Sequence, residues 1–458
     1  MDKLSILFLL LAFSSSFLHE NLASSSGTPD RSEQWGYVEV RPKAHLFWWL
    51  YKSPSRVTNS STPWPIILWL QGGPGGSGVA FGNFLEIGPL DSNLNPRNLT
   101  WLNKADLLFA DSPVGTGFSY VEDRELAVKT DEEAATDLTA LLKELFNGDE
   151  NLQKSPLYIF AESYGGKFAV TLAVSALQAI ETGDLKMQLG GVALGDSWIS
   201  PEDFVFTWGP LLKDLSRMDN KGLNISNSLA LNIQQQLAQG QYKSATSTWS
   251  ELENVILAYS NNVDFYNFML DSENDPVIGI STERSKLISI DRYSRYLEAM
   301  FYKSNGATSN NLDDLMNGPI KDKLKIIPKN VTWGGQSELV FPALVDDFMK
   351  PRIQEVDELL AKGIRVTVYN GQLDLICSTK GAEAWLNKLK WDGLKTFLKQ
   401  ERTPLYCTSD NTTTKGFRSS YENLSFYWIM GAGHFVPVEQ PCISLQMVGN
   451  ITRSPNRI

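Results

Sequence analysis

The chain has 458 residues, of which 42% are hydrophobic, and it carries a net charge of −11 from 52 acidic and 41 basic side chains. This length and composition are those of a folded soluble protein with one large domain or two. The acidic balance argues against a nucleic-acid-binding protein, which usually carries a basic surface. Three cysteines are too few for a disulfide scaffold, so we expect the fold to be held by its core.

The N-terminus has the pattern of a secretory signal peptide. Lys3 precedes the apolar stretch 4–13, and a serine-rich segment leads to Ala23. We expect cleavage close to Ala23, which removes residues 1–23. The apolar stretch is short for a membrane-spanning helix, so we favour a removed signal over a signal anchor and expect no membrane anchor afterwards. The chain is therefore predicted to enter the secretory pathway and to be extracellular, vacuolar or lysosomal.

Entry into that pathway gives two further expectations. Asn-X-Ser/Thr sequons become candidates for N-glycosylation, and they lie at Asn59, Asn98, Asn224, Asn330, Asn411, Asn423 and Asn450. The cysteines at positions 377, 407 and 442 allow one disulfide and one free thiol. The sequence leaves the connectivity open, and we favour a bridge between Cys377 and Cys407.

Strand-like and helical segments alternate along most of the chain. Strands are expected at 35–40, 46–51, 65–70, 106–110, 157–160, 191–194, 364–369 and 426–430. Helices are expected at 130–145 and 167–180, from their apolar spacing. A continuous apolar run such as 65–70 is typical of a strand buried on both faces. The alternation predicts an α/β fold with a mostly parallel central sheet and helices on both faces.

The segment between the core strands differs in character. It is polar and helical, with runs at 224–238 and 247–259. We expect a largely helical cap inserted between two parts of one core, and a second independent domain is the alternative. The expected division is a first core part at 28–198, a cap at 199–340 and a second core part at 341–458.

Three residues in chain order indicate nucleophilic catalysis. Ser163 stands between a strand and a helix, with small residues two positions away on either side, as a strained nucleophile turn requires. Asp374 and His434 each follow a strand-like segment, and His19 and His45 lie in settings that offer no rival base. Serine, aspartate and histidine in this order are typical of an α/β-hydrolase, in which the imidazole moves the serine proton and the carboxylate orients it.

Four motifs together resemble the serine carboxypeptidase family. They are Trp69–Gly76, Asp111–Tyr120, Glu162–Gly166 and Gly431–Pro437. The resemblance runs from about residue 37 to residue 445 and is greatest to the branch of retinoid-inducible serine carboxypeptidase and certain plant serine carboxypeptidase-like proteins. It implies an α/β-hydrolase fold and removal of C-terminal residues from peptides or proteins at acid pH through an acyl-enzyme. It implies no metal and no cofactor.

The resemblance also implies roles for residues around the serine. The backbone N–H groups of Gly73 and Tyr164 are expected to form the oxyanion hole. The terminal carboxylate of the substrate is expected to be bound by four residues, Gln71, Gly72, Glu86 and Glu162. At low pH two crowded carboxyl groups can share one proton, and the protonated one can donate a hydrogen bond to the substrate carboxylate. A solvated helix position is the alternative for Glu86.

The chain departs from the family pattern at three places. Gln71 stands where asparagine is usual, Gly76 where a cysteine is usual and Phe435 where methionine is common. Two other functions remain open, an acyltransferase that uses the same triad and a catalytically inactive secreted binding protein. Family acyltransferases tend to carry aspartate before the nucleophile, so Glu162 favours the peptidase. The complete triad argues against the inactive binding protein.

Overall fold

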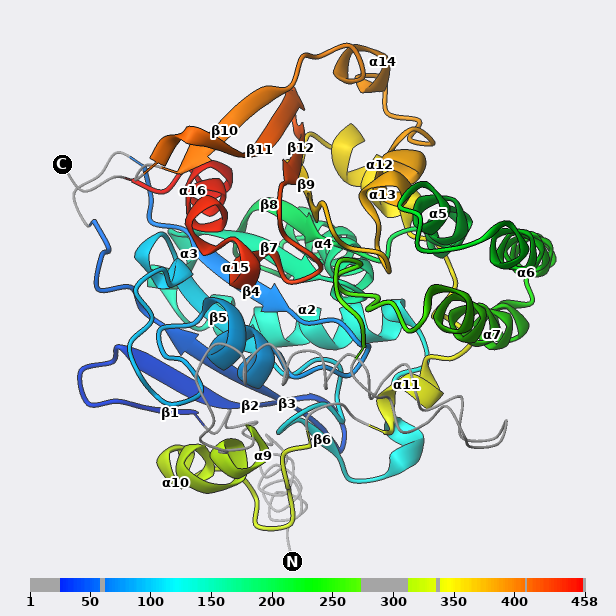
Figure 1. The fold of residues 1–458 in the computed structure, drawn as a ribbon. Helices are drawn as coiled ribbons and strands as arrows, with labels where there is room; N and C mark the ends of the chain where they lie inside the picture. The colour runs from blue at the N-terminus through cyan, green and yellow to red at the C-terminus, as the bar shows by residue number, and fades with distance from the viewer. Residues whose placement is uncertain (1–24, 58–61, 273–311, 335–337, 408–409, 456–458) are drawn as a thin grey trace, which may run out of the picture.

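The computed structural model describes residues 25–57, 62–272, 312–334, 338–407 and 410–455 (Figure 1). The expected signal peptide at 1–23 and the sequon at Asn59 lie outside these ranges. The described strands form one sheet with the order β1-β2-β3-β5-β4-β7-β8-β9-β12-β11-β10, and β6 pairs with β3. Their bounds are β1 Ser25–Gly27, β2 Glu33–Arg41, β3 Ala44–Tyr51, β4 Ile66–Leu70, β5 Asp106–Ala110, β6 Tyr120–Val121, β7 Pro156–Glu162, β8 Gln188–Gly195, β9 Val366–Gly371, β10 Thr403–Cys407, β11 Asp410–Tyr421 and β12 Leu424–Ile429.

The middle of the sheet is parallel and both of its ends are antiparallel. Parallel pairing joins β5, β4, β7, β8, β9 and β12, whereas β1, β2 and β3 at one end and β11 and β10 at the other pair antiparallel. The predicted α/β fold with a mostly parallel centre is therefore confirmed. The expected strands match this sheet, but the short strands β1 and β6 and the strands β10 and β11 were not predicted.

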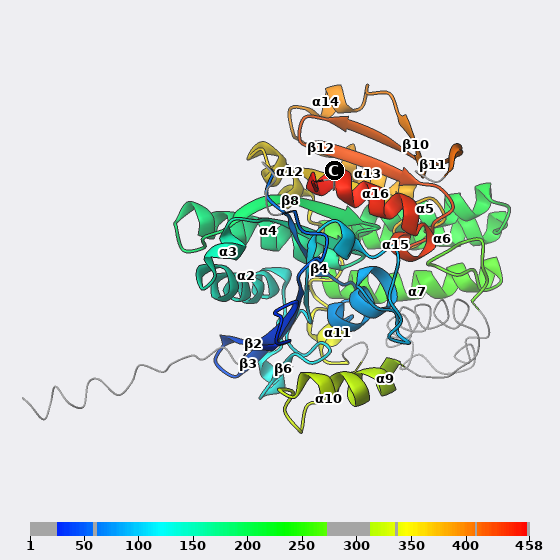
Figure 2. The same ribbon diagram turned by 90° about the vertical axis from the view of Figure 1, so that its left-hand side faces the viewer.

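Helices cover both faces of the sheet (Figures 1 and 2). Their bounds are α2 Asp131–Asn147, α3 Glu150–Gln153, α4 Gly165–Glu181, α5 Pro201–Asp214, α6 Asn220–Ala238, α7 Tyr242–Ser260, α9 Leu312–Leu315, α10 Lys321–Leu324, α11 Val340–Ala343, α12 Ile353–Ala361, α13 Thr379–Leu386, α14 Leu394–Phe397, α15 Val436–Glu439 and α16 Pro441–Thr452, with short helical segments η1 Gly78–Ile87, η2 Trp101–Asn103, η3 Arg124–Leu126 and η4 Met316–Ile320. Local sequence fixes some of these ends. The Thr130 hydroxyl accepts the N–H of Glu133 at the start of α2, and acidic residues fill the first turn.

Two hydrophobic cores lie on opposite faces of the sheet. Adjacent residues of β3 point to opposite sides, so that Trp48 packs in the core with α2 and α4 while Trp49 packs in the core with η1 and α16. Both side chains are buried. The central strands are thus apolar on both faces, which explains why they appear as continuous apolar runs in the sequence.

The inserted segment is helical but divides into two places. Helices α5, α6 and α7 lie together beside the carboxyl ends of the parallel strands, whereas α9 and α10 lie beside β2 and β3 (Figures 1 and 2). Trp35 Nε1 donates to the Leu324 carbonyl at 3.0 Å, and Lys323 pairs with Glu33 at 2.6 Å. Trp333 Nε1 donates to Ser77 Oγ at 3.0 Å. The end of the insertion is therefore attached to β2, at the antiparallel end of the sheet, and to the loop between β4 and η1.

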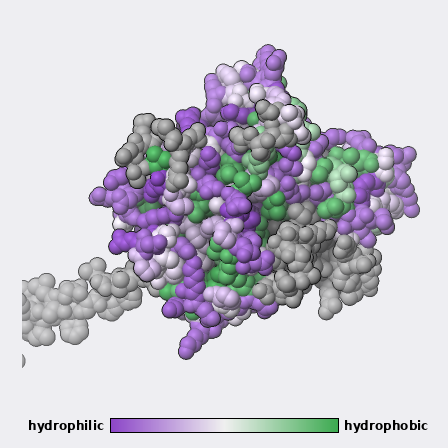
Figure 3. All heavy atoms as spheres, turned by 60° about the vertical axis from the view of Figure 1, so that its left-hand side comes forward, coloured by the Kyte–Doolittle hydropathy of each residue, from purple (hydrophilic) through white to green (hydrophobic). Residues whose placement is uncertain are grey.

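One face of the surface shows how polar and apolar side chains are distributed. The face in Figure 3 is mostly hydrophilic, with smaller apolar areas between the polar side chains. None of the helices in the described part of the chain combines the length and apolar character needed to cross a membrane.

The disulfide joins Cys407 to Cys442, with Cα atoms 6.0 Å apart. The favoured pairing of Cys377 with Cys407 is therefore wrong. Cys407 ends β10, and Cys442 lies in the first turn of α16. Cys377 is a free, buried thiol, and its sulfur lies within 4.8 Å of a carboxylate oxygen of Asp374 and a ring nitrogen of His434. Sequence order gave no sign of this, because Cys407 and Cys442 are brought together by the packing of α16 beside β10.

Candidate active site

The predicted triad residues all follow parallel strands at the same edge of the sheet. Ser163 follows β7, Asp374 follows β9 and His434 follows β12. Ser163 has a φ of 59°, a backbone region that a serine adopts only when its surroundings enforce it. A Cβ on Gly72 would lie 2.4 Å from Ser163 Cβ, and one on Gly165 would lie 2.3 Å from the Leu70 carbonyl oxygen. Glycine is therefore required at position 165, after the serine, and at position 72, in the loop after β4 that lies against this turn.

Asp374 and His434 form a buried pair. The His434 Nδ1 atom lies 2.9 Å from Asp374 Oδ2, and both side chains are 0% exposed. The backbone N–H of His434 donates to the Tyr266 carbonyl at 2.8 Å. The Phe435 ring packs edge to face with the imidazole, with ring centroids 5.2 Å apart. The carboxylate thus fixes the tautomer in which Nδ1 carries the proton and Nε2 can act as a base.

A small pocket with an apolar lining opens beside the serine. It is lined by Gly73, Ser163, Tyr164, Trp198, Trp249, Tyr266, Phe341, Phe348, Ile376 and Cys377. Tyr266 and Cys377 connect this pocket to His434, since the Tyr266 ring packs against the imidazole and the Cys377 sulfur lies close to it. No charged side chain is part of this lining, so the pocket suits an apolar group of a substrate whose reacting carbonyl reaches Ser163.

The predicted oxyanion donors lie on two backbone segments at the pocket. Gly73 has a φ of 112°, which glycine adopts readily. Tyr164 immediately precedes α4, so its N–H lies at the positive end of the helix. Both residues line the pocket together with Ser163. Two N–H groups in such a setting can stabilise negative charge on a carbonyl oxygen.

Gln71, Glu86 and Glu162 form a buried hydrogen-bonded group next to the serine. Gln71 Nε2 donates to Glu86 Oε1 and to Glu162 Oε1, both at 3.0 Å. The Trp69 indole N–H donates to Gln71 Oε1 at 2.7 Å and so fixes which end of the amide faces the carboxyls. Glu86 is 2% exposed, which is contrary to a solvated helix position. Burial raises the pKa of Glu86, although its hydrogen bonds with Glu162 and Gln71 oppose this.

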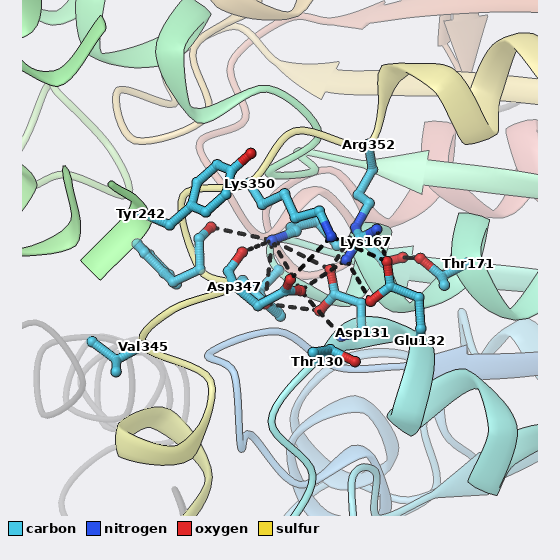
Figure 4. Close-up of polar contacts among 12 residues, drawn as sticks. Thr130, Asp131, Glu132, Lys167, Thr171, Tyr242, Val345, Asp347, Lys350 and Arg352 are labelled. Atoms are coloured by element: carbon cyan, nitrogen blue, oxygen red, sulfur yellow. Dashed lines mark hydrogen bonds and ion pairs between the residues drawn. The ribbon is translucent and has the colours of Figure 1, made fainter. Parts of the chain in front are cut away.

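A second buried group, of acidic and basic side chains, contacts Tyr164, the residue after the serine, and was not predicted from sequence (Figure 4). Lys167 Nζ lies 3.3 Å from Asp131 Oδ2, and Arg352 bonds Asp131 at 2.9 Å and Asp347 at 2.8 Å. The Tyr164 hydroxyl donates to Asp131 Oδ1 at 2.8 Å. Burial raises the pKa of Asp131 to about 6 and lowers that of Lys167. These charges join α2, α4 and the segment before α12.

Two other acidic residues near the triad were not predicted. Asp196 follows β8 and is 0% exposed, and Glu439 belongs to α15. Burial raises the pKa of Glu439 to about 7. The available signal was the position of Asp196 directly after a core strand, where the other active-site residues also occur.

Among the described residues, Asp374, Cys377 and His434 are close enough to share a cation, with ligand atoms within 4.8 Å of one another.

The sequons differ in their surroundings. Asn98, Asn224, Asn330 and Asn450 are exposed. Asn423 is half-buried and donates through Nδ2 to the carbonyls of Leu360 and Ile364, at 2.9 and 2.8 Å, so its amide nitrogen is already engaged. Asn411 lies in β11.

Comparison with known proteins agrees with these features. The family model described as serine carboxypeptidase matches residues 24–454. Serine carboxypeptidase-like 51 of Arabidopsis thaliana is 62% identical over 430 residues, which cover 93% of each chain. The retinoid-inducible serine carboxypeptidase of Homo sapiens is 46% identical over 429 residues, which cover 93% of this chain and 92% of the relative.

A solved structure has the same fold. The prohormone-processing carboxypeptidase Kex1Δp from Saccharomyces cerevisiae superposes with a TM-score of 0.75 at 23% identity, covering 92% of this chain and 91% of the other. At this level of identity the likeness concerns the fold alone.

Proposed function

Because the chain belongs to the serine carboxypeptidase family, we propose that Ser163, Asp374 and His434 are the triad with which this serine carboxypeptidase removes C-terminal residues from peptides. The observation that supports this best is the buried group of Gln71, Glu86 and Glu162. It adjoins the serine through Glu162, the residue that immediately precedes it. A triad alone would cleave many bonds, whereas this group can recognise the end of a chain.

In the proposed reaction, Ser163 Oγ attacks the carbonyl carbon of the last peptide bond. His434 Nε2 takes the serine proton, and Asp374 stabilises the resulting imidazolium. The N–H groups of Gly73 and Tyr164 bind the oxyanion of the tetrahedral intermediate. His434 then returns the proton to the leaving amine, which departs as the free C-terminal residue. A water molecule hydrolyses the acyl-enzyme by the same steps.

The substrate carboxylate is proposed to meet a protonated carboxyl group. Gln71 uses both hydrogens of Nε2 on the two glutamates, so an additional hydrogen bond to the substrate must come from a carboxyl O–H or from the Gly72 backbone. Two buried carboxyls in hydrogen-bonding contact retain a proton between them. That proton gives the site a donor for the incoming carboxylate.

This recognition favours acid pH. The pKa of Glu86 lies above its ordinary value, so the carboxyl stays protonated at higher pH than a solvated glutamate would. As the pH rises through that pKa, the proton leaves and the two carboxylates repel the substrate. Binding of free C-termini should therefore weaken as pH rises. An acidic vacuole, lysosome or extracellular space, reached by the secretory pathway, suits such an enzyme.

The test compares peptides with a free C-terminus and the same peptides with a C-terminal amide. We expect mass spectrometry to show stepwise C-terminal loss from the free acids at about pH 5, slow cleavage of the amides, and no cleavage by S163A. Intact peptides together with labelling of Ser163 by a fluorophosphonate would contradict the peptidase and indicate acyl transfer. Absence of labelling would contradict the catalytic triad and favour a binding protein.

A further inference from the structure

A second carboxyl group lies directly behind the triad. Asp196 has a φ of 41°, in the left-handed region, and its side chain is fully buried. Its Oδ1 accepts the Gly371 N–H at 2.8 Å and Asn370 Nδ2 at 3.1 Å, while its own N–H donates to the Tyr369 carbonyl at 2.9 Å. These bonds fix Asp196 to the end of β9, the strand that leads to Asp374.

The Asp196 carboxyl faces the Asp374 carboxyl. Asp196 Oδ2 receives no N–H or hydroxyl donor within the described part of the chain, and Asp374 is in hydrogen-bonding contact with Asp196. The two oxygens of Asp374 accept from His434 Nδ1 at 2.9 Å and from the Cys377 N–H at 3.3 Å. Two acceptors in contact need a proton between them. Asp374 already accepts from the imidazole, so Asp196 is the residue that is left to hold it.

None of the ion pairs found among the described residues involves Asp196. Burial, followed by the charge of Asp374, raises the pKa of Asp196 well above its ordinary value, and the charge of Glu439 adds to this. The other titratable groups that face it are Tyr369 and Cys377, whose pKa values burial also raises. The Gly371 N–H at the end of β9 opposes this by lowering the pKa of Asp196, but burial and the charge of Asp374 outweigh it and favour the neutral acid.

We propose that Asp196 is a positioning residue of the triad, which as a neutral acid donates its O–H to Asp374 while Asp374 accepts from His434. This inference rests on the proposed function of the triad. The donor fixes the orientation of the Asp374 carboxylate and leaves one negative charge behind the imidazole. A second negative charge would favour the imidazolium form, which cannot take the proton of Ser163. Activity should thus decline when Asp196 ionises, independently of substrate carboxylate recognition.

The experiment measures the second-order rate of Ser163 labelling by a fluorophosphonate from about pH 5 to pH 9. This probe has no carboxylate, so the rate does not depend on Glu86 or Glu162. D196A should react at least about tenfold more slowly, as for loss of a hydrogen bond to a charged group. D196N should recover most of that rate, because its amide can donate to Asp374 and accept from Gly371. D196N should also keep its rate at alkaline pH, where the wild type declines.

Parallel peptide kinetics and a matched control separate positioning from folding. D196A should lower kcat with less than about a threefold change in KM, as expected of an interaction used after binding. D137N alters another buried carboxyl, which pairs with Arg41 at 2.6 Å, and should change thermal stability but leave the pH profile as in the wild type. D196N preserves the test if D196A does not fold.

The inference is wrong if D196A and D196N label at the wild-type rate across the pH range, per mole of folded enzyme. It is also wrong if folded D196N loses as much rate as D196A, since a neutral donor would then not suffice. Labelling of S163A at the wild-type rate would instead overturn the proposed triad. The two failures are therefore distinguishable.

Discussion

The residues on either side of Ser163 reach into two different groups of buried acids. Glu162, before the serine, shares Gln71 with Glu86. Tyr164, after it, donates its hydroxyl to Asp131. We call the first the glutamate pair, and the second, formed by Asp131, Asp347, Lys167 and Arg352, the ion cluster. Both are buried, but only the ion cluster contains cations that bond its carboxylates.

The difference lies in what neutralises the acids. Lys167 and Arg352 are permanent parts of the chain, so the ion cluster has cations that offset its carboxylates when these are ionised, as Asp131 is above its pKa of about 6. It holds Tyr164 and the Phe348 backbone, through Lys167, at the wall of the pocket. In the proposed function, the glutamate pair is instead neutralised by a proton, which a rise in pH would remove and which a bound carboxylate would use. Neutralisation by fixed cations suits the ion cluster to a structural role, and neutralisation by a removable proton suits the glutamate pair to ligand binding.

The largest effect is expected from R352M. Arg352 is 2% exposed, and its removal leaves Asp131 and Asp347 with less compensation in a buried setting. Breaking such a group should lower the free energy of unfolding by about 3–5 kcal/mol, as measured by urea denaturation at pH 7.5. The surface pair between Lys380 and Asp214 is the control, and K380M should cost less than about 1 kcal/mol.

The cost of R352M should shrink at about pH 5. The pKa of Asp131 is about 6, so this carboxyl is ionised at pH 7.5 and increasingly protonated below pH 6. Below that pKa, removal of the arginine leaves less unpaired charge. An equal cost at both pH values would contradict the assignment of the loss to charge and would indicate lost packing instead.

An intermediate effect is expected from a double-mutant cycle. Arg352 Nε lies 2.9 Å from Asp131 Oδ2. In the R352M background, D131N removes the negative charge that the arginine had compensated. The double variant should therefore be more stable than the sum of the single losses by about 1–3 kcal/mol. Additive losses would show that the pair does not interact, and the ion cluster would then not differ from surface ion pairs.

The smallest effect concerns binding by the glutamate pair. For a peptide with a free C-terminus, the wild-type KM should rise about tenfold between pH 4.5 and pH 7.5, which corresponds to about 1.4 kcal/mol. In E86Q/E162Q no carboxyl remains to titrate, so KM should change less than about twofold over the same range. A peptide amide serves as the control substrate. A double variant that keeps the wild-type rise would contradict proton-dependent recognition.

The parallel core could be predicted from sequence because its strands are buried on both faces. The runs at 65–70 and at 157–161, before Ser163, are apolar throughout, and the strand before Asp374 is buried along its whole length although it contains Thr367 and Asn370. The strands β10 and β11 were missed because they form the antiparallel end of the sheet, where the described residues are largely exposed or half-buried and β11 is polar. Apolar runs identify central strands better than edge strands.

The candidate site was predictable where a motif carries the chemistry. Ser163, Asp374 and His434 each occupy a turn after a strand, and the structure brings the last two to 2.9 Å. The ion cluster and Asp196 were not found, since their function depends on distant partners. Arg352 and Asp131 are 221 residues apart in the chain, and no local pattern indicates that they meet.

The disulfide also has a topological consequence. The bridge from Cys407 to Cys442 closes a covalent ring that contains β11, β12 and the loop with His434. A single proteolytic cut within residues 408–441 would open that ring without separating the chain into two pieces. The histidine would stay covalently joined to the core through one side of the bridge, wherever the cut fell. In an oxidising compartment, where such bridges persist, a nicked molecule would remain one covalent unit until it is reduced.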